Sequence, residues 1–139
     1  MTGMQPSRMA SSMITARVDQ AKIKRGAVAI VDLEPTQGGE IKKTRPCVII
    51  SPDSYNSRLK TIIVVPITSV KPESPILSSE VSIPAPQGGL EVDSKAQPCQ
   101  IRCVDKSRIL RIAGRLSPEL VTAIQQSTQM AIGSIPTDR

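Results

Sequence analysis

The sequence predicts a mainly β fold: a small, partly open β-barrel of about six to seven strands, followed by one C-terminal α-helix. The apolar residues are mostly Ile, Val and Leu, with one Tyr, no Phe and no Trp. Branched side chains of this kind favour extended backbone. Short apolar runs alternate with segments rich in Pro and Gly, which is typical of strands joined by turns. Helical spacing of apolar residues is clear only near the C-terminal end.

The strands are predicted from the apolar runs that turn residues interrupt. The first two are expected at residues 26–33 and 46–51, on either side of a loop rich in Pro and Gly. A third strand at 61–65 is apolar on both faces, which is typical of a central strand. Further strands are expected at 80–83, 96–104 and 108–116, with an exposed loop at 71–79 and a turn at 84–89.

The C-terminal helix has recognisable start and stop signals. Ser117 is a suitable N-cap, Pro118 suits the first helical position, and Glu119 favours the positive end of the helix dipole. Apolar residues repeat at helical spacing from Leu120 onward, and Gly133 can end the helix. We expect this helix to pack against the sheet.

The chain of 139 residues suits one domain with an extension at its N-terminus. Residues 1–23 lack the compact apolar segment of a signal peptide, so we expect a flexible extension there and a folded domain at 24–139. No apolar run reaches the ~20 residues needed to cross a bilayer. We therefore expect a cytoplasmic protein that does not associate with a membrane.

The cysteines do not form a metal-binding pattern. Cys47, Cys99 and Cys103 are an odd number without the spacing of a zinc site, and the chain has no histidine. We interpret them as small buried residues in the reducing cytoplasm. No metal and no other cofactor is expected.

Basic residues are concentrated around the first predicted loop. The whole chain has 18 Lys and Arg against 12 Asp and Glu, a formal charge of +6. Five of the basic residues lie within residues 36–60: Lys42, Lys43, Arg45, Arg58 and Lys60. Such a patch attracts polyanions, and its binding to them weakens with salt. With a single Tyr, recognition of nucleic acid would depend on hydrogen bonds and phosphate contacts instead of stacking.

Two motifs place a chemically useful side chain beside a branched strand. Arg45 closes the Gly-rich loop, and Thr68 follows an apolar run interrupted by Pro66. A guanidinium presents a planar fork of donors to phosphate oxygens, and a hydroxyl adds one more hydrogen bond. Each residue also has an ordinary explanation, because Arg45 could pair with Glu40 and Thr is common in strands.

Short fragments spread over residues 24–133 form a further pattern. They are Arg25-Gly26, Val31-Asp32-Leu33-Glu34-Pro35, Gly38-Gly39-Glu40, Thr44-Arg45-Pro46, Val48-Ile49-Ile50-Ser51, Asn56, Val65-Pro66-Ile67-Thr68-Ser69, Asp93-Ser94, Gln100-Ile101-Arg102, Asp105-Lys106-Ser107-Arg108 and Gly114-Arg115-Leu116. In their order and spacing these fragments resemble the MazF/PemK toxins of bacterial toxin–antitoxin systems.

The resemblance implies a fold, an activity and partners. The fold is an SH3-like barrel with a C-terminal helix, working as a homodimer. The activity is metal-independent, sequence-specific cleavage of single-stranded RNA, typically mRNA, which leaves 2′,3′-cyclic phosphate and 5′-hydroxyl ends and inhibits translation and growth. A cognate antitoxin protein neutralises such a toxin, and we expect an acidic, partly disordered antitoxin segment.

The resemblance also assigns the site, with Arg45 and Thr68 as the catalytic pair. With no histidine, no side chain has an ordinary pKa near neutrality, so Arg45 would stabilise charge and the proton acceptor stays open, with Glu40 as one candidate. Loop and strand-end positions suited to RNA are Thr36, Gln37, Glu40, Lys42, Lys43, Ser69 and Gln100.

Two alternatives share this fold. A gyrase poison of the same architecture relies on a C-terminal Trp, which this chain lacks. A protein that only binds RNA or an antitoxin would have the fold without the chemistry. Cleavage of RNA that depends on Arg45 and Thr68 separates the enzyme from both.

Overall fold

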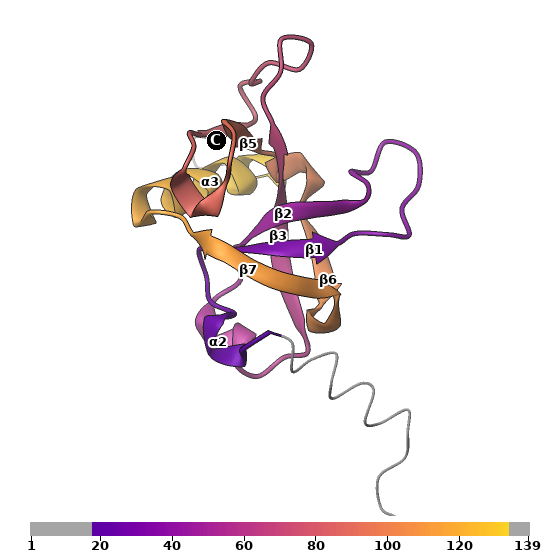
Figure 1. The fold of residues 1–139 in the computed structure, drawn as a ribbon, viewed down its shortest axis with the longest axis vertical. Coiled ribbons are helices and arrows are strands. Elements are labelled where there is room, and N and C mark those ends of the chain that lie inside the picture. Colours follow the sequence, from indigo (N-terminus) through magenta and orange to yellow (C-terminus); the bar gives the residue numbers. More distant parts are fainter. Residues whose placement is uncertain (1–17, 134–139) are drawn as a thin grey trace, which may run out of the picture.

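The computed structural model describes residues 18–133. Within that range seven antiparallel strands form one open sheet in the order β4-β5-β3-β2-β1-β7, and β6 pairs with β3 beside this path. Figure 1 shows the sheet coiling on itself, with α3 packed behind its upper part. The strands are β1 (Ala27–Asp32), β2 (Thr44–Ile49), β3 (Thr61–Ser69), β4 (Val81–Ile83), β5 (Ser94–Ala96), β6 (Arg102–Asp105) and β7 (Ile109–Arg115). The helices are α2 (Asp53–Asn56) and α3 (Pro118–Ala131), with 3₁₀ turns η1 (Gln20–Lys22), η2 (Gln87–Gly89), η3 (Pro98–Gln100) and η4 (Lys106–Arg108). The predicted mainly β fold is confirmed.

Strand β3 is the centre of the sheet and has three partners. β2 pairs along one side of it, while β6 pairs with its first half and β5 with its second half. The sequence predicts an end at residue 65, but β3 continues to Ser69. Pro66 withholds only its N–H, and its carbonyl oxygen accepts the backbone N–H of Gln97 at 2.9 Å. The strand therefore passes through the proline and carries Thr68 inside its regular part.

The single strand expected at 96–104 is wrong, because two strands and a turn occupy this segment. β5 pairs with the end of β3 and β6 pairs with its beginning, so the chain must step along β3 between them. Pro98 starts the 3₁₀ turn η3 that makes this step. A proline suits that position because it has no N–H to offer a ladder.

Two apolar clusters cover the two faces of the coiled sheet. One cluster is built around Ala29, Val31 and Val64, and the other around Val48, Val65 and Ile67. Helix α3 adds Val121 and Ile124 to the second cluster. Full burial of such a side chain is worth about 1.5–3 kcal/mol, so the two clusters account for most of the drive to fold.

The folded part of the chain begins before residue 24. Val18 and Ile23 are buried and belong to the first cluster, and the turn η1 lies between them, where the sequence places the extension. Residues 1–17, the rest of the expected extension, lie outside the described range. The apolar side chains at 18 and 23 were the available signal for this boundary.

Helix α3 begins and is capped as predicted. The Ser117 hydroxyl accepts the backbone N–H of Leu120 at 3.2 Å, and Pro118 is the first helical residue. The expectation for the cysteines is only partly right, because Cys47 is buried while Cys99 and Cys103 are exposed. Between residues 18 and 133 no helix has the length and apolar character to cross a bilayer.

Candidate functional site

The register of two strands places Arg45 and Thr68 at one corner of the sheet. Their hydrogen-bonded ladder ends with Cys47 opposite Pro66, and counting two residues outward on each strand sets Arg45 opposite Thr68. Side chains at opposed positions project from the same face of an antiparallel sheet, with Cβ atoms about 5 Å apart where the ladder continues. Both residues are half-buried, so each keeps access to solvent.

Arg45 is anchored through one nitrogen of its guanidinium. Its Nε donates to the carbonyl oxygen of Lys42 at 3.1 Å. Glu40, which the sequence suggests as a partner, instead accepts the backbone N–H of Gln37 through Oε1 at 2.6 Å. Among residues 18–133 the only ion pair joins two other residues, Lys95 and Glu80. The two terminal amino groups of Arg45 are therefore not neutralised by a carboxylate of this described range.

Gln100 holds the Gly-rich loop beside Arg45. Its Oε1 accepts the backbone N–H of Ile41 and its Nε2 donates to the carbonyl oxygen of Gly39, both at 3.2 Å. These contacts occupy both ends of an amide that the sequence suggests as an RNA ligand. In this structure Gln100 positions the loop across about sixty residues of sequence separation.

Two arginines fix the point where strand β1 enters the same loop. Arg102 donates from Nη1 to the carbonyl oxygen of Leu33 at 3.2 Å. Arg108 donates to the carbonyl oxygen of Asp32 at 3.1 Å and also to that of Glu34. Neither arginine is among the site residues predicted from the sequence. Both are half-buried and both lie in fragments of the family resemblance, but their contacts span more than sixty residues, so the sequence does not show what they hold.

Within the loop, Glu34 holds two of the five residues predicted to contact RNA. Its Oε2 accepts the backbone N–H of Lys43 at 2.8 Å, and its Oε1 accepts the Thr36 hydroxyl at 3.3 Å. Lys43 has a positive φ of 69°, and both it and Lys42 are exposed. Gln37 and Glu40 are exposed as well. The loop thus brings its lysines to the surface next to Arg45.

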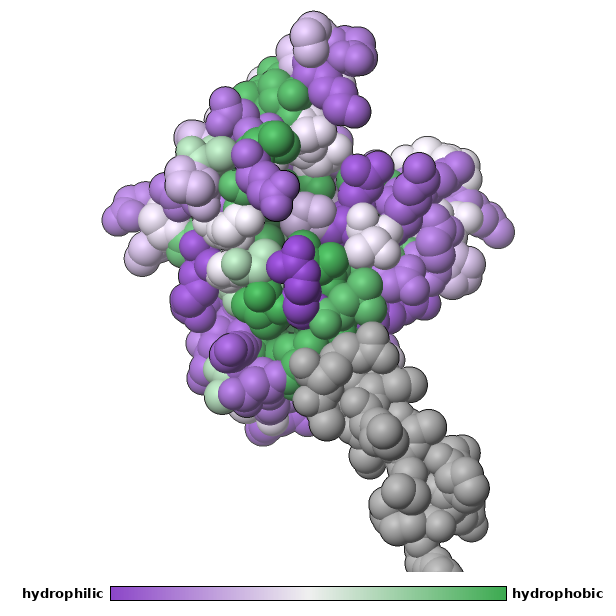
Figure 2. All heavy atoms as spheres, viewed as in Figure 1, coloured by the Kyte–Doolittle hydropathy of each residue, from purple (hydrophilic) through white to green (hydrophobic). Residues whose placement is uncertain are grey.

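A second loop, residues 70–80 between β3 and β4, lies on the other side of Thr68. Figure 1 shows it projecting at the top, while the loop between β1 and β2 projects to the right. Figure 2 shows the surface indented between these two projections, of which the right-hand one is largely hydrophilic and the upper one also carries hydrophobic residues. Ser69, predicted to contact RNA, is half-buried at the base of loop 70–80, paired with Ser94. The candidate site is this corner.

The turn predicted at 84–89 packs away from this corner. Its η2 residues lie against β7 and β1. A Cβ on Gly89 would come within 2.2 Å of the carbonyl oxygen of Ala113, so the two glycines allow the backbones to touch. Loop 70–80 therefore forms the β3–β4 side of the corner without this turn.

Cys47 lies two residues from Arg45 along β2, and its thiol is unreactive. It faces the first apolar cluster, and its thiol is 3.7 Å from the carbonyl oxygen of Arg45. Burial raises the pKa of the Cys47 thiol to about 12, although the nearby charge of Arg102 opposes this shift. A neutral thiol is a poor nucleophile, so the corner contains no competing thiolate.

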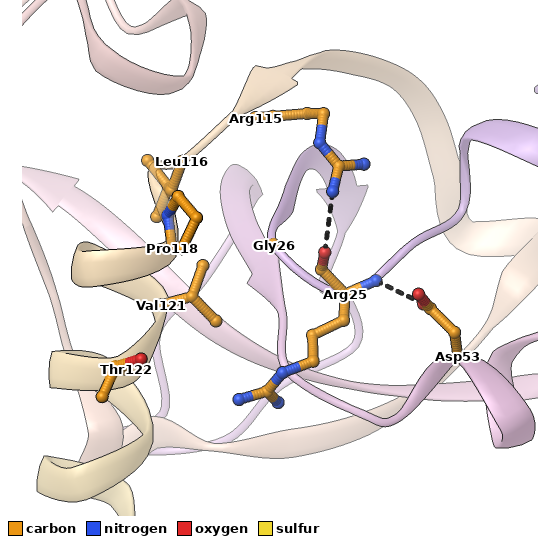
Figure 3. Close-up of a pocket in the computed structure, with 8 residues that line it drawn as sticks. All are labelled: Arg25, Gly26, Asp53, Arg115, Leu116, Pro118, Val121 and Thr122. Atoms are coloured by element: carbon orange, nitrogen blue, oxygen red, sulfur yellow. Dashed lines mark hydrogen bonds between the residues drawn. The ribbon is translucent and has the colours of Figure 1, made fainter.

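A second pocket with an arginine and a threonine is shown in Figure 3. It has a volume of about 270 Å³ at the far end of β1, and its lining includes Arg25, Arg115 and Thr122. The two terminal amino groups of Arg25 donate hydrogen bonds to the carbonyl oxygen of Ile50 and to the side-chain oxygen of Gln125. The donors of Arg25 are therefore already occupied by other groups of the protein. This pocket fits a phosphodiester less well than the corner does.

Asp53 adds to this internal network. It accepts the backbone N–H of Arg25 at 2.7 Å. This hydrogen bond is the main cause that lowers the pKa of the Asp53 carboxyl, with smaller contributions from Asn56, Lys24 and Arg115 against the opposing effect of burial. A charged carboxylate in the pocket would repel a phosphate.

Across residues 18–133 no group of three or more His, Cys, Asp and Glu side chains could hold a metal ion.

Comparison with known proteins identifies similar sequences and folds. The family model for PemK-like, MazF-like toxins of type II toxin–antitoxin systems matches residues 24–131. Endoribonuclease MazF9 of Mycobacterium tuberculosis (strain ATCC 25618 / H37Rv) is 34% identical over 113 residues, covering 78% of this chain and 94% of that protein. Endoribonuclease EndoA of Bacillus subtilis (strain 168) is 33% identical over 113 residues, covering 81% and 97%.

A similar fold occurs in the solved structure of an endoribonuclease in complex with its cognate antitoxin from Mycobacterial species. The TM-score is 0.62 at 17% sequence identity, over 83% of this chain and 98% of that chain. At this identity the match shows a shared fold only. The similarity to the two curated endoribonucleases extends over nearly their whole length.

Proposed function

This chain belongs to the family of PemK-like, MazF-like toxins of type II toxin–antitoxin systems, and from that premise we propose that it is an endoribonuclease. Its substrate is single-stranded mRNA, cut at short sequences, and the consequence is inhibited translation and growth. The named activity of its relatives supports this proposal. The observation that supports particular residues is the strand register, which ends with Cys47 opposite Pro66 and, extended by two residues on each strand, brings Arg45 and Thr68 to one face beside a basic loop.

The proposed reaction is attack by the ribose 2′-oxygen on the adjacent phosphorus. The 2′-hydroxyl loses its proton, the new P–O2′ bond closes a 2′,3′-cyclic phosphate, and the P–O5′ bond breaks. The 5′-oxygen then takes up a proton. Charge builds on the two non-bridging oxygens during this exchange, so donors aimed at them stabilise the transition state. No step requires a metal ion.

Arg45 and Thr68 divide this task. The terminal amino groups of Arg45 bind the non-bridging oxygens as a fork, while its Nε stays on the carbonyl oxygen of Lys42. The Thr68 hydroxyl donates to the same phosphate from a fixed strand position. A guanidinium is a poor base because its pKa exceeds about 12, so Arg45 acts as an electrostatic group and proton donor. Glu40 stays a candidate for the base, with Oε1 holding the Gln37 N–H.

The RNA path follows from the exposed and half-buried polar groups around the pair. Lys42 and Lys43 contact backbone phosphates, and Thr36, Gln37 and Ser69 offer hydrogen bonds to bases or sugars. Gln100 acts through the loop that it holds. Phosphate contacts of this kind make affinity fall steeply with salt. Positioning the reacting phosphate can lower the activation barrier of cleavage by about 7 kcal/mol or more. We propose that this effect replaces the histidine base that the chain lacks.

The partners follow from the same site. A cognate antitoxin covers the basic corner with an acidic segment, since a toxin–antitoxin family requires an antidote. Two copies of the chain form a homodimer through an apolar face over β7, and the protein acts in the cytoplasm, where its mRNA substrate is translated. Each of these statements can be tested independently of the cleavage assay.

The decisive experiment is incubation of the purified protein with a long RNA in EDTA, followed by mapping of the new ends. We expect cuts that persist in EDTA, with 2′,3′-cyclic phosphate on one side and a 5′-hydroxyl on the other. Arg45→Ala and Thr68→Ala should abolish them while circular dichroism shows an intact fold. Trapping of gyrase on DNA, with RNA left uncut, would instead identify the gyrase poison.

A further inference from the structure

A buried lysine beside the candidate site ties down loop 70–80. Lys95 lies in β5 and its side chain is only 2% exposed. Its ammonium reaches Glu80 Oε1 at 2.9 Å, the Ser74 hydroxyl at 3.1 Å and the carbonyl oxygen of Pro75 at 2.9 Å. An ammonium has three N–H donors, so every one of them has a partner on this loop. We call this arrangement the Lys95–Glu80 clamp.

Glu80 is equally well satisfied. Its Oε1 also accepts the backbone N–H of Leu77 at 2.8 Å, and its Oε2 accepts the Gln97 amide at 3.0 Å. Burial alone would raise the pKa of the Glu80 carboxyl, but the hydrogen bonds from Leu77, Lys95 and Gln97 outweigh it and hold that pKa below its usual value. The carboxylate is therefore charged near neutral pH, and the clamp is ionic.

The clamp is attached to the strand that carries Thr68. Lys95 is the direct cross-strand partner of Thr68 on one side and of Ser82 on the other. Opposed residues share a face of the sheet, and the β2 register places Arg45 on that face too. The ammonium thus leaves the ladder beside Thr68 and holds loop 70–80 over the face where the candidate pair lies.

The outer side of loop 70–80 is free to meet a ligand. Ile76 is 41% exposed and Leu77 is 58% exposed, while Ser78 and Ser79 are exposed next to them. Single-stranded RNA is read through splayed bases that accept apolar contacts and hydrogen bonds. Ile76 and Leu77 offer the apolar contacts, while Ser78 and Ser79 line a pocket shared with Cys99 and the end of α3.

We propose that the Lys95–Glu80 clamp fixes loop 70–80 as one wall of the RNA groove and thereby selects the nucleotides accepted beside the scissile phosphate. The proposal rests on the endoribonuclease function above and adds a positioning pair to it. A buried ion pair contributes little net stability compared with apolar residues of similar size, but it demands one geometry. An ionic clamp is therefore better suited to fixing a loop than to stabilising the fold.

The test compares wild type with the double variant Lys95→Met/Glu80→Met, which removes both charges and leaves neither unpaired. Lys24→Met is the matched control, because that lysine is exposed between η1 and β1 and its charge acts on Asp53 of α2, which lies at the end of the molecule opposite loop 70–80 (Figure 1). The first readout is the sequence profile around all cuts in a long RNA, and the second is kcat and KM on a single-site oligonucleotide. Hydrogen exchange of the peptide covering 74–80 is the third.

We expect the double variant to cut a broader set of sequences, with KM raised about tenfold and kcat changed less than about threefold. Exchange at the Leu77 amide should rise at least about tenfold, since its acceptor on Glu80 is gone. Glu80→Gln should shift the profile in the same direction but less, which covers failure of the double variant to fold. The control should match wild type in all three readouts.

The proposal is overturned if the double variant folds and keeps the wild-type profile, or if kcat falls with KM unchanged. Unaltered exchange across 74–80 would also overturn it, because the clamp would then not order the loop. Wild-type protein that leaves RNA uncut would refute the endoribonuclease function itself, and the clamp proposal with it. Cutting by wild type with an unchanged variant profile would refute the clamp proposal alone.

Discussion

At the scale of single residues, Arg45 is the group on which the proposed chemistry depends most. Its Nε already has a partner, so binding of phosphate relies on the planar pair of terminal amino groups. Arg45→Lys keeps the charge but removes the fork, and we expect single-turnover cleavage to slow by about 10²-fold or more. Cleavage within about threefold of wild type would contradict the fork and leave only a point charge.

The control for this change is a pair of variants at Thr68. Thr68→Ser keeps the hydroxyl and should retain most activity, whereas Thr68→Val keeps the shape and should lose most of it. Thermal unfolding of all three variants should stay close to wild type, because both positions are half-buried at the end of a ladder. Equal rates for the Ser and Val variants would remove Thr68 from the mechanism.

The three cysteines should differ sharply in reactivity. Burial raises the pKa of the Cys47 thiol to about 12 from an ordinary 9.0, so this thiol stays protonated at pH 8.5 and reacts slowly, whereas Cys99 and Cys103 are exposed to a reagent. Iodoacetamide at pH 8.5 should therefore label Cys99 and Cys103 within minutes and Cys47 only after denaturation. Mass spectrometry of tryptic peptides measures this, and fast labelling of Cys47 in the native protein would show that the core under Arg45 opens readily.

At the scale of elements, the Gly-rich loop should depend on Gln100. Its amide holds Gly39 and Ile41 by two hydrogen bonds, and each such bond is worth about 1 kcal/mol net. Gln100→Ala should leave the sheet intact, increase hydrogen exchange at the Ile41 amide, and reduce kcat/KM by about tenfold through misplaced lysines. Gln97→Ala is a matched control, since that amide contacts Glu80 and not this loop; loss of loop protection in the control would contradict a specific role for Gln100.

The contact between η2 and β7 should tolerate no added side chain. A Cβ on Gly114 would lie 2.6 Å from the carbonyl carbon and 2.8 Å from the carbonyl oxygen of Gly88. Because both neighbours are backbone atoms, Gly114→Ala should lower the free energy of unfolding in urea by about 1–3 kcal/mol. Gly39→Ala, where no atom lies within 4 Å of the added Cβ, should change it by less than about 0.5 kcal/mol.

Local signals predicted the elements well, and distant contacts set most of what the sequence missed. Ser117 and Pro118 mark the start of helix α3 because the cap and the first helical residue interact within one turn. The predicted start is therefore confirmed. The proline at 98 was a local signal for a break in the segment 96–104. The break is required because the two halves of this segment pair with different parts of β3. Periodicity cannot show which strand pairs with which, so the segment 96–104 read as one strand.

The candidate site divides in the same way. The resemblance to a toxin family led to Arg45 and Thr68, and the register is consistent with their meeting at one corner. Three residues that shape the corner, Lys95, Arg102 and Arg108, make contacts to residues 15 to 76 positions away. The two arginines lie in fragments of the family resemblance, but the sequence does not show which carbonyl oxygens they contact. Lys95 lies in no such fragment, and its burial is recognised only with its partner Glu80.

At the scale of the whole molecule, β7 offers a surface for a second copy of the chain. It is the last strand in the sheet order, and Leu110 on it is 37% exposed. Figure 2 shows apolar residues gathered on the viewed face, where Figure 1 places β7 in front. Apolar side chains on an unpaired edge favour either specific association or aggregation. In a homodimer this edge would be covered by the second copy.

This face yields the prediction for assembly. Wild-type protein should elute with multi-angle scattering at twice the chain mass, and Leu110→Glu should shift it to the monomer, because a buried unpaired carboxylate at the centre of an interface costs several kcal/mol. Leu59→Glu is the matched control: that leucine is 49% exposed in the turn before β3, away from β7, and its variant should stay dimeric. A Leu110→Glu protein that remains a dimer would place the interface elsewhere. A wild type that is monomeric at every concentration would mean that the corner of one protomer must bind and cut RNA alone.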